Sequence, residues 1–86
     1  MGKKQQAIKN IDLTSKLADY IAVHPEASKK VFASGGSVVP FSATDKELNK
    51  ANEELVKDLL KEGKNVVKAE ETKSKLEPWK FITVPS

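Results

Sequence analysis

The chain of 86 residues has no cysteine, no arginine and no long apolar run. The absence of cysteine excludes disulfides, thiolate nucleophiles and thiolate metal sites. Small secreted domains usually depend on such cross-links, so we expect a cytoplasmic protein. No apolar segment approaches the roughly 20 residues that cross a bilayer, and the basic start MGKKQQAIKN lacks the apolar core of a secretory signal. We therefore expect no membrane contact.

The absence of arginine limits the nucleic-acid functions that the chain can have. Its 15 basic residues are all lysines, and 12 acidic residues are interspersed with them, for a net charge of +3. Arginine makes the bidentate contacts by which proteins recognise phosphate and guanine, so specific recognition is disfavoured. Mixed charges are typical of a solvated surface. A basic face that binds nucleic acid without sequence preference stays as the alternative.

The N-terminal third predicts a tail and two helices. Residues 1–9 are polar and predict a flexible tail before a single domain over residues 10–86. An apolar stripe then predicts a helix that begins near Ile11, with Asn10 or Asp12 as its cap, and that ends before Pro25. HPEASKKVF predicts a second, short helix, and residues 34–36 predict a break.

The remaining chain predicts strands around a well-marked helix. SVVPF reads as a strand, and Pro40 favours an edge position because proline donates no ladder hydrogen bond. Thr44 and Glu47 match a capping box for a helix over residues 45–62, and Gly63 suits its end. NVVKAEE and WKFITV predict two further strands. The fold class predicted is α/β: a small three-stranded sheet containing one β-α-β unit, with the N-terminal helices packed on it.

The sequence contains few residues that could act in catalysis or bind a metal. His24 is the only histidine, and we interpret it as a structural residue at the helix corner. There is no G-x-S-x-G sequence, and the glycine pair in SGGSVV precedes a strand, whereas phosphate loops follow one. We therefore expect no catalytic residue, no metal and no organic cofactor.

Two asparagines on the central predicted helix form the first candidate site. Asn52 falls within the apolar stripe, where a buried amide must find hydrogen bonds. One interpretation is that it ties the helix to the backbone of residues 34–36 or 42–43. The other is that Ser42, Asn49 and Asn52 line a polar ligand cleft at the C-terminal end of the first strand, which would suit a small enzyme.

The last strand holds the second candidate site. Trp79 and Phe81 share one face of the predicted strand, and Lys80 lies between them. Aromatic rings beside a lysine suit single-stranded nucleic acid. The same pattern also fits a strand that faces the core. A third interpretation is that this strand, or the strand with Pro40, pairs with another chain and builds a dimer.

Three segments together resemble a family of small uncharacterised prokaryotic α/β proteins, a domain of unknown function. They are HPE at residues 24–26, DKELNKANEEL at residues 45–55 and EGKNVV at residues 62–67. The likeness covers about residues 11–84. In that family a helix and an HPE corner precede a short strand, a helix and a second strand. The resemblance implies the same fold, and it implies no activity, cofactor or catalytic residue.

The sequence thus favours a small non-catalytic interaction module that binds a protein partner or itself. Non-specific nucleic-acid binding through lysines and residues 79–82 is the first alternative. A small enzyme with a cleft at residues 42–52 is the second.

Overall fold

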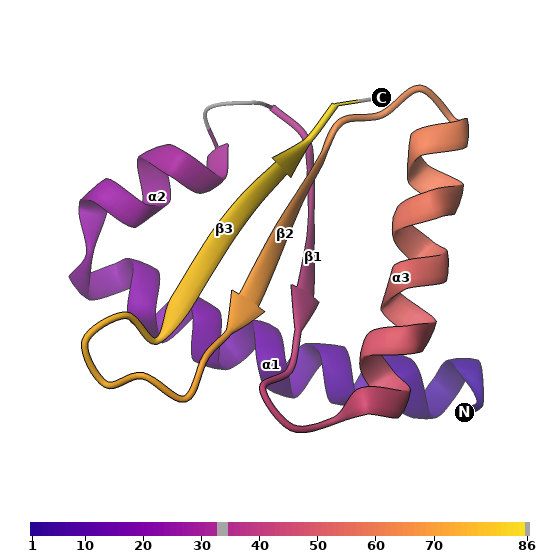
Figure 1. The fold of residues 1–86 in the computed structure, drawn as a ribbon, viewed down its shortest axis with the longest axis horizontal. Helices are drawn as coiled ribbons and strands as arrows, with labels where there is room; N and C mark the ends of the chain where they lie inside the picture. The colour runs from indigo at the N-terminus through magenta and orange to yellow at the C-terminus, as the bar shows by residue number, and fades with distance from the viewer. Residues whose placement is uncertain (33–34, 86) are drawn as a thin grey trace.

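The computed structural model describes residues 1–32 and 35–85, which form three helices and one three-stranded sheet (Figure 1). The strands lie in the order β1-β2-β3, with β1 and β2 parallel and β2 and β3 antiparallel. The predicted α/β fold with one β-α-β unit is confirmed. In chain order the elements are α1 (Lys3–Val23), α2 (Pro25–Phe32), β1 (Ser37–Phe41), α3 (Lys46–Lys61), β2 (Val66–Glu71) and β3 (Trp79–Val84).

Helix α1 begins much earlier than its apolar pattern predicts. Residues 3–9 of the predicted tail are helical, and Asn10 lies within the helix, so its predicted role as a cap is wrong. Gln6 and Asn10 continue the stripe of the buried Leu13 and Leu17 at helical spacing, and both bond to α3. These contacts with a distant segment stabilise the first turns, whereas local propensity alone did not predict them. Among the described residues, no helix combines the length and the apolar composition needed to cross a bilayer.

The helix corner and the turn into β1 lie close to where the sequence predicts them. Helix α1 ends at Val23 and α2 begins at Pro25, as the restriction on residues before proline requires. Of the predicted break at residues 34–36, Ser34 lies outside the described residues. Gly35 has a φ of 64°, a conformation that glycine adopts without strain.

Helix α3 is correctly predicted, but its N-terminal cap is one residue later than expected. Asp45 is the cap, and its carboxylate accepts a hydrogen bond from the Leu48 backbone N–H at 3.0 Å. The predicted Thr44 cap is wrong because the Ser42 Oγ accepts from the backbone N–H groups of Thr44 and Asp45, which forms a turn ahead of the helix. Glu47 instead lies 3.2 Å from the amino nitrogen of Met1.

At the other end of α3, the predicted glycine stop is confirmed. Gly63 has a φ of 79°, and its N–H donates to the Leu60 carbonyl at 3.0 Å. The N–H of Lys64 donates to the Leu59 carbonyl at 3.1 Å, which completes a Schellman motif.

The two faces of the sheet pack against different helices. In Figure 1, α1 crosses the strands on one side, α2 lies beyond β3, and α3 runs alongside β1. Since side chains alternate along a strand, neighbouring residues of the sheet belong to different clusters. The α1 cluster consists of Leu13, Leu17, Leu48, Ala69 and Trp79. The α3 cluster consists of Val39, Phe41, Val56 and Val66.

The two outer edges of the sheet differ. Strand β1 carries Pro40, which is buried and has no N–H to donate, and α3 packs against this strand. The predicted edge position of Pro40 is therefore confirmed. Strand β3 forms the opposite edge, and within the described residues it pairs with β2 alone.

The cap of α3 generates a prediction about pH. The Lys9 ammonium, which hydrogen-bonds the Asp45 carboxylate at 2.8 Å, holds the pKa of that carboxyl below its ordinary value, and the Leu48 N–H lowers the pKa further. Because the folded pKa is the lower one, the charge stabilises the fold above the unfolded pKa of about 3.9. This stabilisation is lost as the pH falls through the folded pKa.

Asp45→Asn keeps a capping side chain and removes the charge. We expect wild type to have a higher free energy of unfolding than Asp45→Asn near neutral pH. This difference should shrink as the pH falls below about 4. Urea unfolding at several pH values measures it. In a Lys9→Met background most of the pH dependence should disappear, and an unchanged dependence there would contradict the role given to Lys9.

Candidate functional site

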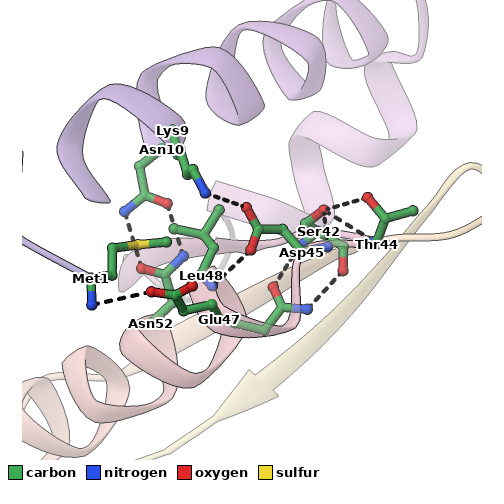
Figure 2. A network of polar contacts seen from close by, with 10 residues as sticks. Met1, Lys9, Asn10, Ser42, Thr44, Asp45, Glu47, Leu48 and Asn52 are labelled. Atoms are coloured by element: carbon green, nitrogen blue, oxygen red, sulfur yellow. Dashed lines mark hydrogen bonds and ion pairs between the residues drawn. The ribbon is translucent and has the colours of Figure 1, made fainter. Parts of the chain in front are cut away.

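The side chain of Asn52 is fully buried where α1, β1 and α3 meet. Its Nδ2 donates to the Asn10 Oδ1 at 2.8 Å and to the Pro40 carbonyl at 2.9 Å. Its Oδ1 accepts from the Asn10 Nδ2 and the Gln6 Nε2, each at 3.0 Å. Figure 2 shows the reciprocal pair that Asn10 and Asn52 make. Both donors and both acceptor positions of the Asn52 amide are thus used.

This geometry gives Asn52 a structural task. The expected tie to the backbone exists, but it is made at Pro40 and not at residues 34–36 or 42–43. The reason lies in the sheet: β1 pairs with β2 on one side only, so an outward carbonyl of β1 needs another donor. The amide of Asn52 supplies that donor and joins the edge strand to both helices.

Ser42, in the turn between β1 and α3, lies beside Asn49, which belongs to the first turns of α3. The Asn49 Oδ1 accepts from the Ser42 N–H at 2.7 Å, and its Nδ2 donates to the Ser42 carbonyl at 2.8 Å. The amide therefore binds both backbone groups of Ser42, as a neighbouring strand would. Figure 2 shows the Ser42 hydroxyl beside Thr44 and Asp45 in this turn, and Glu71 of β2 also binds the turn, because its Oε1 accepts from the Ala43 N–H at 3.1 Å.

The structure brings Ser42, Asn49 and Asn52 to one end of β1, as predicted, and it engages their polar groups with protein partners. Ser42 also lines a cavity of about 140 Å³ together with Lys9 and Asp45. Ligand pockets usually measure about 300–1,000 Å³, so this hollow is small for an organic substrate. The cleft interpretation stays a prediction.

The second candidate group lies on β3. Trp79 is only 5% exposed and belongs to the α1 cluster, so its ring packs inside the domain. Phe81 packs partly against the same cluster, and Lys80 is exposed. Stacking with nucleic-acid bases needs accessible ring faces. Because Trp79 is buried, its ring is not available for such stacking in this structure.

The same three residues nevertheless border a groove of about 380 Å³, which we call the β3–α2 groove. Its walls come from β3, from α2 and from the end of α1. The other residues that line it are Tyr20, Glu26, Ala27, Lys30 and Glu77. The groove thus runs beside the edge of the sheet that pairs with no other described strand.

The only histidine lies at the corner between α1 and α2. The His24 ring stacks on the Tyr20 ring, with centroids 4.2 Å apart and an interplanar angle of 26°. Its Nδ1 lies 3.2 Å from the Glu26 Oε1. A hydrogen bond from its own backbone N–H lowers the pKa of Glu26 most, burial opposes this shift, and His24 and Lys30 lower the pKa further. His24 therefore stacks and pairs at the corner, consistent with the structural interpretation.

Sequence reasoning missed Gln6 and Lys9, because both were assigned to the tail. Gln6 bonds to Asn52 and Lys9 pairs with Asp45, so each connects α1 to α3. The spacing of Gln6, Asn10, Leu13 and Leu17 gave a usable signal, since these residues fall on one helical face. Within residues 1–32 and 35–85 no group of three histidine, aspartate or glutamate side chains is arranged to hold a metal ion.

Comparisons of the chain with protein-family models, with curated protein sequences and with solved structures find no match. The resemblance to the family of small prokaryotic proteins therefore stays a prediction.

The Asn52 amide generates a prediction about stability. Asn52→Ala leaves the Pro40 carbonyl and the amides of Asn10 and Gln6 without their partner, and we expect it to lower the free energy of unfolding by about 2–4 kcal/mol. Asn49→Ala is the matched control on the same helix: it removes a half-buried amide and should cost less, about 1 kcal/mol. Urea unfolding measures both variants.

A double-mutant cycle with Asn10→Ala separates the amide pair from the packing around it. The two substitutions should be non-additive by about 1 kcal/mol or more, because they remove the same pair of hydrogen bonds. Additive losses would contradict the assignment of Asn10 and Asn52 as one unit.

Proposed function

We propose that this chain is a small non-catalytic interaction module that binds an extended segment of another protein as a fourth strand beside β3. The observation that carries the proposal is the β3–α2 groove, which lies beside a sheet edge that pairs with no other strand among the described residues. An edge strand presents backbone N–H and C=O groups that an incoming strand can pair with. This mode of recognition gains affinity from the main chain and specificity from side-chain pockets.

The two edges of the sheet suggest why β3 is the docking edge. Pro40 removes a donor from β1, and α3 packs against that strand. The residues of β3 itself include no proline, since Pro78 and Pro85 lie just outside it. Ile82 and Thr83 are exposed, so a strand can approach this edge without displacing a side chain of the core.

The groove has a volume and charged lining residues that suit a peptide. Its volume of about 380 Å³ falls in the usual range for ligand sites, about 300–1,000 Å³. Lys30 on α2 and Lys80 on β3 both line the groove, and neither makes an ion pair within the described residues. Glu26 is already paired with His24. Lys30 lowers the pKa of the nearby Glu26, and the two ammonium groups at the groove favour a segment that carries acidic side chains.

A peptide array tests the proposal. Octapeptides that alternate threonine and valine would carry aspartate, serine or lysine at two positions, and each would be titrated into the isotope-labelled chain. We expect the aspartate series to shift the amide resonances of residues 25–32 and 79–84 most strongly, because Lys30 and Lys80 face the groove. Combined Lys30→Glu and Lys80→Glu substitutions should reverse the preference, whereas Lys29→Glu outside the groove should not. A failure of every series to shift residues 79–84 would overturn the proposal.

Proline substitutions test whether the peptide pairs as a strand. Neighbouring residues of an antiparallel edge strand point their N–H groups alternately toward β2 and outward. Of Ile82→Pro and Thr83→Pro, one should therefore keep the β2 ladder and lose an outward donor. That folded variant should bind the aspartate series about tenfold more weakly. Leu76→Pro is the control, since Leu76 is 98% exposed and lies off the edge; full binding by the folded edge variant would exclude strand addition.

A further inference from the structure

Helix α1 carries a second apolar face that the fold leaves exposed. Ile8 is 56% exposed and Ile11 is 67% exposed, although both are large aliphatic residues. Ser15, Ala18 and Ala22 continue this face at spacings of three and four residues, and all three are exposed. We call these five residues the outer face of α1. They lie opposite the stripe of Leu13 and Leu17 that packs on the sheet, because α-helical residues repeat every 3.6 positions.

Two hollows adjoin the outer face. One, of about 340 Å³, is lined by Ile11, Thr14, Ser15 and Ala18 together with Asn10. The other, of about 350 Å³, lies between α1 and α2 and shares Thr14 and Ala18 with the first. Phe32, which is 63% exposed, stands on the wall of the second hollow. The two hollows adjoin each other at Thr14 and Ala18, and these small side chains let another backbone approach α1 closely.

The length of the outer face suits a helix. From Ile8 to Ala22 the helix rises about 21 Å, or four turns. A helix that docks on a groove uses apolar anchors at positions i, i+3 or i+4, and i+7. The residues of the outer face repeat at the same spacings of three and four, so they can pack against such anchors.

The charges beside the outer face indicate which helix fits. Asp12 and Asp19 lie seven residues apart along one flank of the face, both exposed, and neither makes an ion pair within the described residues. Lys16 lies between them in sequence, and its Nζ makes an ion pair with the Glu71 Oε2 at 3.7 Å. Two unpaired carboxylates at heptad spacing are complementary to a helix with lysine or arginine at the same spacing.

The same charges disfavour a second copy of this chain. In an antiparallel two-fold pair of α1 helices, the flank of Asp12 and Asp19 meets the same flank of the copy, and like charges oppose one another. In a parallel pair Ile8 faces Ile8 while Ala22 faces Ala22, which leaves the alanine end poorly filled. We therefore infer that the outer face of α1 binds a basic amphipathic helix of another protein. This inference is independent of the groove beside β3.

Three 18-residue peptides test this inference. They share an apolar face of leucines at heptad positions a and d, and they carry lysine, glutamine or glutamate on the flanks. Titrated into the isotope-labelled full chain, the lysine peptide should shift the amide resonances of residues 8–22 and of Phe32, with about threefold to tenfold higher affinity than the glutamine peptide. The glutamate peptide should bind most weakly. Combined Asp12→Lys and Asp19→Lys substitutions should invert that order.

Matched substitutions on α1 locate the contact. Ala18→Lys puts a charge in the middle of the outer face and should weaken binding of the lysine peptide about tenfold or more. Val23→Lys is the control, because Val23 is 71% exposed on the same helix but lies outside the face; it should lower the affinity much less.

Three results would overturn the inference: equal affinity for all three peptides, shifts confined to other elements, or concentration-dependent dimerisation of the free chain that Ala18→Lys abolishes. Shifts at residues 25–31 and 79–84 report the β3–α2 groove instead. Failure of either proposal is therefore distinguishable from failure of the other.

Discussion

One buried amide fixes how the helices sit on the sheet. Apolar burial drives α1 and α3 onto the strands, but it is non-directional and specifies neither their height nor their angle. Asn52 adds direction, since its four hydrogen bonds reach two residues of α1 and the carbonyl of Pro40. A slide of α1 would break the three hydrogen bonds that Gln6 and Asn10 make with this buried amide, at a cost of about 1–3 kcal/mol. The positions of the β3–α2 groove and of the hollows beside α1 follow from that arrangement.

The parts of the fold that the sequence predicts well are those with local causes. Helix α3 has a dense apolar stripe and a glycine at its end, and the three strands are short β-branched or aromatic runs, so all four elements lie close to their predicted bounds. The cap is Asp45 and not Thr44 because Ser42 organises the preceding turn, and a serine three residues upstream of a cap gives no distinctive signal.

The parts that the sequence predicts poorly depend on distant partners. The first turns of α1 are polar, and they hold their place through bonds to residues of α3 that lie 36 to 46 positions away. Likewise, alternation predicts which face of β3 carries Trp79. It does not predict that residues of α2 line a groove together with residues of β3. Pairing of distant segments is what creates this groove, and no local pattern encodes it.

The separation of 42 positions between Asn10 and Asn52 also has a consequence during synthesis. At a translation rate of about 5–20 residues per second, α1 leaves the ribosome roughly 2–8 seconds before its amide partner does. In that interval neither the stripe of Leu13 and Leu17 nor the outer face of α1 is covered by the sheet or by α3. The nascent helix therefore exposes two apolar sides at once. A chaperone has the most apolar surface to bind at this stage of synthesis.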